Sequence, residues 1–288
     1  MFVSYKIFIS VLYFQLNMDK ETVSKINNFV AQKPRTIQEV AQFIGKNWRT
    51  ADSYINKISE EQGTISVRTF RGGTRGALKI VYWNMIDKNQ STFQEMLFQR
   101  IINCKNKFDF SSFDIYQYID DSGRECFIEE QEDNLNIKQD LIKTVSSGEK
   151  QVLIFSGDLS WAEAKQGKEK LSKCFENLIK KNVSIKIIAN IDLNSIKNVK
   201  KITEINHKLG KELIEVRHCQ QPLRAFIVDD NLARIKEKYF LKKTATNTFL
   251  FYSITDEDWI NWLQKMFWHF FSTAISAEKR IKDLESIR

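Results

Sequence analysis

The chain has 288 residues, of which 42% are hydrophobic and 12% aromatic, which is enough for two domains of ordinary size with buried cores. Its 44 lysines and arginines outnumber its 36 acidic residues, and the net charge of +8 excludes an acidic, disordered chain and favours an anionic partner. Two prolines and ten glycines exclude a collagen-like protein, and the lack of a Cys-x-x-Cys pair excludes a zinc ribbon. Four cysteines and three scattered histidines therefore predict a reducing cytoplasm, no metal and no cofactor.

Residues 1–18 form an apolar leader ahead of an abruptly polar sequence. The leader is shorter than the roughly 20 apolar residues that cross a bilayer, and it is interrupted by polar side chains. A secretory signal would need a basic start and an Ala-x-Ala-like cleavage site, which it lacks. Two interpretations stay open, a weakly membrane-binding or packing segment and a mis-called start codon. The good helix opening at Met18 favours the second, so we expect no membrane attachment.

Residues 19–88 are predicted to form a basic helical domain, because residues 1–90 hold thirteen lysines and arginines against seven acidic residues, a net of +6. Apolar residues at helical spacing predict a first helix that ends before Pro34. Thr36 and Glu39 form a capping box for a second helix, which ends at Gly45. A third helix over 48–59 turns four apolar side chains inward, namely Ala51, Tyr54, Ile55 and Ile58.

A strand over 65–71, a glycine-rich turn and a second strand over 77–83 predict a hairpin after the third helix. Two helices joined by a short turn form the unit that reads DNA, and the hairpin would serve as its wing. Such helical units also bind proteins, and a basic turn is often merely exposed to solvent. The helical unit and the basic hairpin, taken together with the local net charge of +6, nevertheless favour DNA as the partner. The expected DNA contacts are Thr36, Asn47, Trp48, Arg49, Thr50, Ser53, Asn56, Lys57, Arg68, Arg71 and Arg75.

Residues 19–83 resemble the winged helix-turn-helix of archaeal TrmB-type transcriptional regulators, most clearly over TIQEVAQFIGKNWRTADSYINKISEEQG. This resemblance implies that Trp48, Arg49, Thr50 and Ser53 begin the recognition helix, which would lie in the major groove of double-stranded DNA.

Residues 89–134 are predicted to be a helical linker. A helix over 92–106 has one apolar face, which would either pair two subunits or pack on a neighbouring domain. The acidic residues Glu129, Glu130, Glu132 and Asp133 have a spacing that could suit a metal, but such runs are typical of a solvated surface.

Residues 135–288 alternate between strands and helices, which predicts an α/β layered fold and makes the whole chain a multi-domain α/β protein. Strands are expected over 151–155, 183–189, 213–217, 224–228 and 249–254. Helices are expected over 135–146, 165–182, 191–209 and 256–287.

The segment QPLRAFIVDDN resembles part of the HxKxxxxD motif of the phospholipase D superfamily, in which His attacks phosphorus, Lys binds the phosphate and Asp supports the histidine. Arg224 stands at the Lys position and Asp229 at the Asp position, but Pro222 replaces the histidine. The Gly-Ser-x-Asn turn of the family is also missing. The resemblance, over about residues 135–275, implies an α/β sandwich that senses a ligand without catalysing a reaction.

By the same resemblance, Asp158, Arg224 and Asp229 would lie near the former catalytic site and bind a small polar or anionic ligand, unless they form a structural ion pair. His218 lies six residues before Arg224 and is expected to be a polar residue at a strand end, so it does not replace the nucleophile.

The sequence as a whole predicts a cytoplasmic, dimeric, DNA-binding transcriptional regulator that is not an enzyme. One alternative is a nuclease or phosphodiesterase of the phospholipase D superfamily, which the winged helix delivers to DNA. Pro222 in the place of the histidine disfavours this alternative. A second alternative is a protein-interaction adaptor, which would need no arginines at the hairpin turn.

Overall fold

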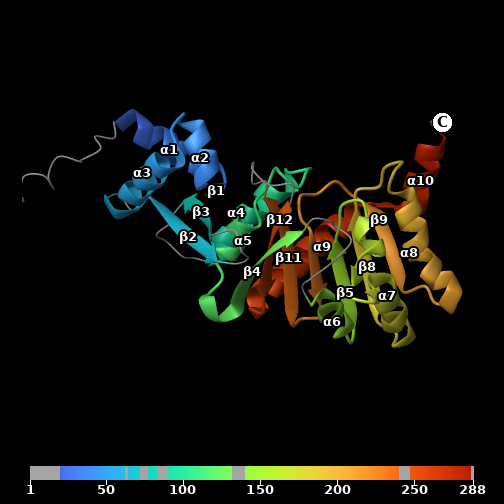
Figure 1. Ribbon diagram of the computed structural model, residues 1–288. Coiled ribbons are helices and arrows are strands. Elements are labelled where there is room, and N and C mark those ends of the chain that lie inside the picture. The colour runs from blue at the N-terminus through green and yellow to red at the C-terminus, as the bar shows by residue number, and fades with distance from the viewer. Residues whose placement is uncertain are drawn as a thin grey trace, which may run out of the picture. The chain divides into compact units, whose positions relative to one another are not determined.

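The computed structural model describes residues 20–61, 64–71, 77–83, 90–131, 140–239 and 247–286 (Figure 1). The chain divides into two compact units, one of Met1–Thr69 with Leu78–Ile86 and the other of Phe70–Ala77 with Asp87–Arg288. The predicted leader over 1–18 and the turn over 72–76 lie outside the described residues.

The first unit contains three helices and a small sheet in strand order β1-β3-β2. The helices are α1 (Lys20–Gln32), α2 (Ile37–Phe43) and α3 (Trp48–Glu61), and the strands are β1 (Arg35–Thr36), β2 (Ile65–Arg71) and β3 (Ala77–Trp83). β1 runs antiparallel to β3, with Arg35 opposite Val81. These elements agree with the sequence-based boundaries to within a few residues.

Local sequence signals explain how the helices of the first unit begin and pack. The Thr36 hydroxyl accepts a hydrogen bond from the Glu39 N–H at 3.1 Å, while the Thr36 N–H donates to the Glu39 carboxylate at 2.7 Å. This capping box satisfies two backbone donors at the start of α2. The inward-facing side chains expected for α3 are all buried, and they pack with Ile26, Val40 and Val81 in one core.

The second unit is built on an eight-stranded mixed sheet in the order β13-β9-β8-β5-β10-β11-β12-β4. Its strands are β4 (Arg124–Gln131), β5 (Gln151–Phe155), β8 (Ser184–Ala189), β9 (Ile214–His218), β10 (Ala225–Val228), β11 (Leu232–Tyr239), β12 (Asn247–Ile254) and β13 (Ile275–Ser276). β5, β8 and β9 are parallel, whereas the strands from β10 to β4 pair antiparallel.

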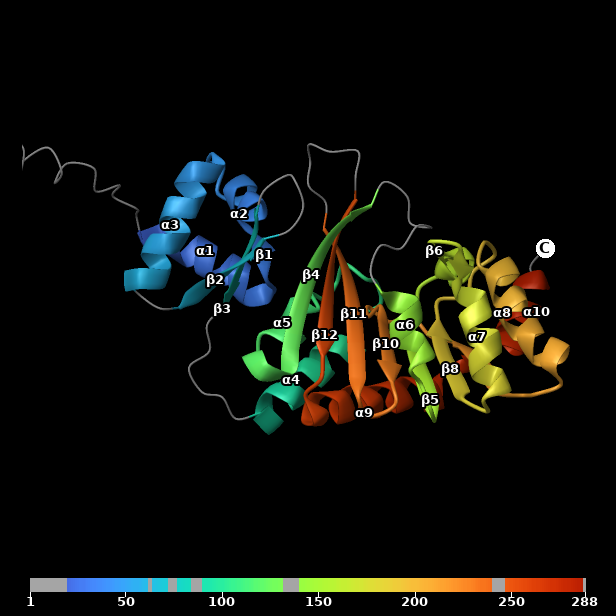
Figure 2. The same cartoon turned by 60° about the horizontal axis from the view of Figure 1, so that its bottom comes forward.

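Helices cover both faces of this sheet. They are α4 (Gln90–Ile102), α5 (Phe113–Tyr116), α6 (Leu141–Ser146), α7 (Leu171–Lys180), α8 (Ile196–Leu209), α9 (Glu257–Thr273) and α10 (Ala277–Glu285). One face packs on α6, α7 and α8 through a core that includes Ile154 and Ile187. The other packs on α9, where the rings of Phe155 and Phe267 lie 5.2 Å apart, and Figure 2 shows α9 running across the strands. The second unit is therefore a layered α/β structure, as expected.

The structure corrects the predicted helical linker over 89–134. Residues 90–131 belong to the second unit and end in β4, which pairs with β12 over its whole length. The apolar side of α4 packs within its own unit, because Phe93 stacks on Tyr118 at 4.3 Å and Leu97 is buried. The sequence of β4 shows no clear alternation, and its partner strand lies more than a hundred residues away, so no local signal identified it.

Two long helices expected in the C-terminal half are shorter in the structure. Residues 165–170 form the two-stranded pair β6 (Lys165–Gln166) and β7 (Glu169–Lys170), with Gly167 between them at a φ of +61°, and α7 begins only at Leu171. The region over 256–287 is interrupted by β13, whose Ile275 pairs with His218 of β9. In the predicted helix over 135–146, the described part is helical from Leu141.

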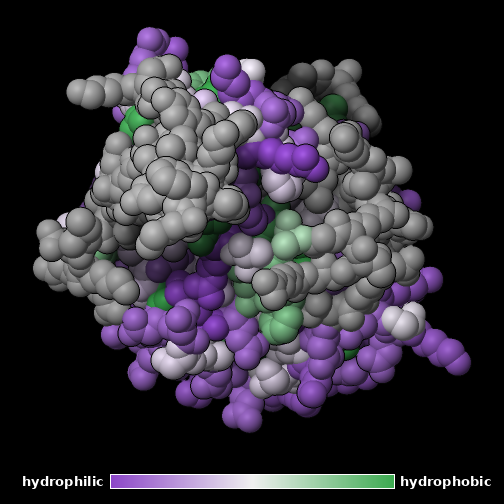
Figure 3. Space-filling view, turned by 60° about the vertical axis from the view of Figure 1, so that its left-hand side comes forward, coloured by the Kyte–Doolittle hydropathy of each residue, from purple (hydrophilic) through white to green (hydrophobic). Residues whose placement is uncertain are grey.

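None of the described helices combines the length and the apolar character that a membrane span requires. Within the same residues, no three His, Cys, Asp or Glu side chains are arranged to hold a metal ion, and Glu132 and Asp133 lie outside them. Hydrophilic side chains predominate among the described residues on the face shown in Figure 3, with a small hydrophobic group near its centre.

Candidate functional site

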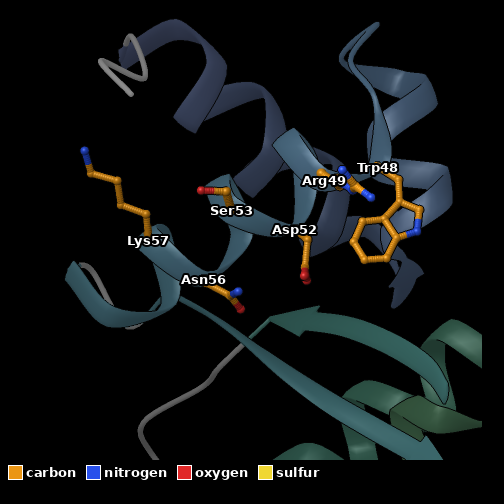
Figure 4. A pocket seen from close by; sticks show the side chains of 6 residues that line it. All are labelled: Trp48, Arg49, Asp52, Ser53, Asn56 and Lys57. Atoms are coloured by element: carbon orange, nitrogen blue, oxygen red, sulfur yellow. The ribbon is translucent and has the colours of Figure 1, made fainter. Parts of the chain in front are cut away.

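The outer face of α3 in the first unit presents a row of polar side chains around a shallow depression. The depression is lined by Trp48, Arg49, Asp52, Ser53, Asn56 and Lys57 (Figure 4). Trp48 is 54% exposed, although indole is usually buried, and Arg49, Ser53 and Asn56 are exposed as well. The structure thus brings together six residues that helical spacing places on one face, five of which were predicted to contact DNA.

The carboxylate on this face, that of Asp52, forms an ion pair with a lysine of the neighbouring hairpin. Asp52 accepts hydrogen bonds from Lys79 of β3, with 2.9 Å between Nζ and each carboxylate oxygen. The Asp52 side chain is only 16% exposed, so the pair is partly shielded from solvent. In Figure 4 Asp52 points toward the paired strands, whereas Ser53 and Lys57 point away from them. The ion pair holds α3 against the sheet and offsets the negative charge beside Arg49.

Other residues predicted to contact DNA have structural roles in the first unit. Asn47 caps α3, because its side-chain oxygen accepts a hydrogen bond from the Thr50 N–H at 2.9 Å. Thr36 is buried, and its hydroxyl and N–H are both engaged by Glu39, so the structure assigns it to the capping of α2 instead. Arg68 is half-buried on β2. The Arg71 side chain and all of Arg75 lie outside the described residues.

The second unit contains a cavity of about 270 Å³ beside the ends of β5 and β10. Five cationic residues line it, together with a group of aromatic rings and two acidic residues. The cations are Lys107, Arg224, Arg234, Lys236 and Lys238, and the rings include Phe108, Phe110, Phe155, Trp161, Phe226, Phe249 and Phe251. The arrangement combines strong positive charge with apolar walls, which suits an anion more than a neutral polar molecule.

Arg224 lies in this cavity against a glycine. A side chain on Gly157 would place its Cβ 2.9 Å from the Arg224 Nε, so the guanidinium fits only because residue 157 has none. Arg224 Nη1 donates to the carbonyl of Leu223 at 2.6 Å, and burial lowers the pKa of Arg224 while Asp158 opposes that shift. Burial disfavours ionisation of Asp158 as well, but hydrogen bonds from Ser160 and the charge of Arg224 lower its pKa overall.

Cations and rings alternate across the two neighbouring strands β11 and β12. Lys236 lies opposite Phe251 and Lys238 opposite Phe249, and the Lys236 Nζ is 3.7 Å from the centre of the Phe249 ring. Burial lowers the pKa of Lys236 to about 8; the carboxylate of Glu129 opposes this shift and the charges of Lys238 and Lys107 add to it. Repulsion between these cations would be relieved by a bound anion.

Glu237 faces away from the cations, although it also lines the cavity. Successive residues of a strand point to opposite faces, and the Tyr252 hydroxyl donates to the Glu237 carboxylate at 3.2 Å on that other face. Burial raises the pKa of Glu237 to about 7. Asp158 therefore balances the charge of Arg224, and Glu129 that of Lys236.

Asp229 and His218 lie away from the cavity, which corrects the expected grouping of Asp158, Arg224 and Asp229. The Asp229 carboxylate accepts hydrogen bonds from three successive backbone N–H groups, those of Glu149, Lys150 and Gln151, at 2.8–2.9 Å. Asp229 therefore fixes the start of β5. His218 Nδ1 accepts a hydrogen bond from the Ile191 N–H at 2.9 Å, which makes it a structural residue at a strand end.

Four of the cavity's cations were not singled out in the sequence, namely Lys107, Arg234, Lys236 and Lys238. A signal for three of them exists, because LARIKEKY places a basic residue at every second position from Arg234 to Lys238 and so puts them on one face of a strand. Lys107 has no such signal, since it reaches the cavity from a loop more than a hundred residues earlier.

Comparisons with known proteins give distant likenesses in structure. No family model and no curated protein matches the sequence. The structure is similar to Nuc, a phospholipase D family member from Salmonella typhimurium, at 11% identity over 53% of this chain and 97% of that chain, with a TM-score of 0.39. It is similar to NucT from Helicobacter pylori at 13% identity over 53% of this chain and 99% of that chain, with a TM-score of 0.37.

A third neighbour covers nearly the whole chain. It is TrmBL2, described as an archaeal chromatin protein with a novel mode of DNA binding, at 13% identity over 95% of this chain and 100% of that chain, with a TM-score of 0.38. All three TM-scores are below 0.5, so these likenesses assign neither a family nor a function to this chain.

Proposed function

We propose that this protein is a cytoplasmic, DNA-binding transcriptional regulator, in which the first unit reads double-stranded DNA as a winged helix-turn-helix and the second binds a small ligand. The observation behind this proposal is the face of α3. Its apolar side is fully packed, whereas Trp48, Arg49, Ser53 and Asn56 are exposed in successive turns of the helix. A packed helix that exposes a polar row is the geometry with which such proteins read the major groove.

A selection experiment on the full-length chain tests this proposal. The protein would be incubated with a random duplex library, the bound duplexes sequenced, and the affinity for the enriched sequence measured by fluorescence anisotropy. We expect one preferred sequence and an affinity that falls steeply with salt, because lysine and arginine contacts to phosphates release counterions. Binding without any sequence preference would refute sequence-specific regulation, and no binding at all would favour the adaptor alternative.

A dimer is part of the proposal, because one recognition helix covers only one half-site. This does not depend on the apolar face of α4, which is packed within its own unit. The preferred duplex should then contain two related half-sites, and light scattering on the free protein should give twice the mass of one chain. A monomer that binds a single half-site would remove this part of the proposal.

A nuclease or phosphodiesterase is the second candidate, favoured by the cationic cavity that contains Arg224 beside Asp158. We propose that the protein is not an enzyme of this kind, because Pro222 lines the cavity where a histidine nucleophile would be needed, and a proline ring has no nucleophilic atom. Hydrolysis of a chromogenic phosphodiester by the full-length protein tests this. Turnover that survives in His218→Ala and disappears in Arg224→Ala would favour the enzyme.

A further inference from the structure

We propose that the cavity of the second unit binds a small organic anion with a flat, apolar body and a doubly charged head group, either a phosphate monoester or a pair of carboxylates. This inference rests on the ligand-sensing role proposed above and adds the chemical class of the ligand.

The positive charge of the cavity favours a ligand with more than one negative charge. Four of its cations, Arg224, Arg234, Lys236 and Lys238, are half-buried, and Lys107 is exposed at the rim. Asp158 offsets part of the charge of Arg224, Glu129 part of that of Lys236, and Asp140 and Glu125 part of that of Arg234, whereas Glu237 faces the opposite side of the sheet. Lys107 and Lys238 still repel Lys236, and a head group with two negative charges would offset both of them in this partly desolvated space.

Two arginines of the cavity have hydrogen-bond donors without an acceptor within the part of the chain that the structure describes. Arg224 donates through Nη1 to two backbone carbonyls, which leaves its Nε and Nη2 without an acceptor there. The Arg234 Nη1 is buried and finds no acceptor among the same residues, although the Nε of this residue donates to Ser253 at 3.1 Å. A planar guanidinium with two spare donors matches the two oxygens of a phosphate or carboxylate group.

The walls of the cavity indicate a flat, apolar body beside the charged head. The rings of Phe249 and Phe251 lie beneath Lys236, and the rings of Trp161 and Phe226 pack edge to face at 5.5 Å. Phe108 at the rim is 45% exposed. Rings arranged in this way bury an aromatic or similarly flat ligand through stacking and edge contacts. The 270 Å³ of the cavity is near the lower end of ligand pockets, about 300–1,000 Å³, which favours a single small molecule over a polymer segment.

Isothermal titration of the full-length protein with matched probes tests this inference. Adenosine monophosphate and isophthalate supply the two kinds of head group on a flat body, adenosine is the uncharged counterpart, and inorganic phosphate lacks the body. We expect at least one of the two flat anions to bind at least tenfold more tightly than both adenosine and phosphate. Equal binding of adenosine, or no saturable binding of either flat anion up to millimolar concentration, would overturn the inference.

Charge-neutral variants locate the binding. Lys236→Gln should weaken binding of the better flat anion by about tenfold, the scale of one charge-assisted hydrogen bond. Lys107→Gln, at an exposed rim position that does not contribute to folding of the core, should weaken it in the same direction. The matched control is Lys282→Gln on the exposed side of α10, which follows β13 at one edge of the sheet; it removes the same charge outside the cavity lining and should change nothing. Equal affinity in all three variants would overturn the inference.

The same variants separate this inference from the proposed function. Binding of the preferred duplex is measured in parallel, and Lys236→Gln should leave it unchanged. If Lys236→Gln weakens duplex binding but not binding of the flat anion, the cavity contacts nucleic acid and the inference fails. If the flat anion binds in the cavity but no duplex is bound, the ligand class stands and the regulator proposal fails.

Discussion

Lys79 of β3 lies 2.9 Å from both carboxylate oxygens of Asp52 on α3. The contact joins the hairpin to the helix whose outer face contains the residues proposed to read DNA. It also offsets the charge of a carboxylate in the middle of the face that we propose to approach phosphates. Under the proposed function, the pair would have an electrostatic role as well as a structural one.

Removing Lys79 should weaken duplex binding, because Lys79→Ala leaves Asp52 as an uncompensated negative charge on the face proposed to read DNA. The loss is expected to be about 1 kcal/mol, the scale of a partly exposed charge pair. Anisotropy titrations at low and high salt measure it. The double variant Lys79→Ala with Asp52→Asn should recover most of the affinity; if it binds as weakly as the single variant, the effect of Lys79 is not through Asp52.

Arg49 should provide sequence preference. Arg49→Ala is expected to cost about 1–3 kcal/mol on the preferred duplex if the guanidinium contacts a guanine edge, and the cost should disappear on duplexes changed at one base pair. Lys25→Ala on the exposed side of α1 removes the same charge and serves as the control. A loss that is equal on every duplex would assign Arg49 to the phosphate backbone instead.

Gly157→Ala should displace Arg224 without unfolding the protein, because the new Cβ would lie 2.9 Å from Nε and a guanidinium can move aside. We expect binding of the flat anion to weaken by about tenfold, as for the loss of a charge-assisted hydrogen bond. The urea midpoint should stay near that of the unaltered protein, which shows that the change is local. Unchanged anion binding would mean that Arg224 does not contact the ligand.

Asp229 should matter for stability and not for binding. Asp229→Ala removes the acceptor of three backbone hydrogen bonds and is expected to lower the free energy of unfolding by about 3 kcal/mol or more. Asp229→Asn should lose less, since asparagine tolerates the φ of +46° at this position and keeps one oxygen acceptor. Urea unfolding measures both variants. A variant of Asp229 that is stable but no longer binds the anion would contradict this assignment.

Binding of the anion should weaken as the pH rises from 7 to 9. Burial, together with Lys238 and Lys107, lowers the pKa of Lys236 to about 8, so the residue is mostly charged at pH 7 and mostly neutral at pH 9. A phosphate monoester stays ionised over that range, so the ligand does not lose charge as the pH rises. Lys236→Arg should remove the pH dependence, because guanidinium stays protonated. An unaltered protein whose affinity is flat from pH 7 to 9 would exclude Lys236 as a contact.

The helices of the first unit could be predicted because their signals are local. The capping box joins residues three apart, and the inward-facing side of α3 repeats with the period of a helix. The predicted helix boundaries that were wrong are those where pairing with a distant strand determined the secondary structure. Ile275 and Ser276 lie within a sequence of helical character, but they pair with β9 and form the short strand β13.

The cavity could be predicted only in part, because its residues come from distant places in the chain. Arg224 and Asp229 were grouped because both match the KxxxxD part of the phospholipase D motif. Five residues of strand span about 16 Å, however, so they lie at opposite ends of β10. Lys107 and Lys236 meet only through the tertiary fold, which no sequence spacing encodes.

The pairing of β4 with β12 has a consequence for how the chain is made. The 115 residues between Gln131 and Asn247 must be synthesised before these strands can meet, which at roughly 5–20 residues per second takes on the order of 10 s. The first unit needs no residue beyond Ile86, so its helices can be complete on the ribosome while the edge of the second sheet is still unpaired. An open strand edge of this kind is a site of aggregation, and the nascent chain is therefore most in need of chaperone protection during that interval.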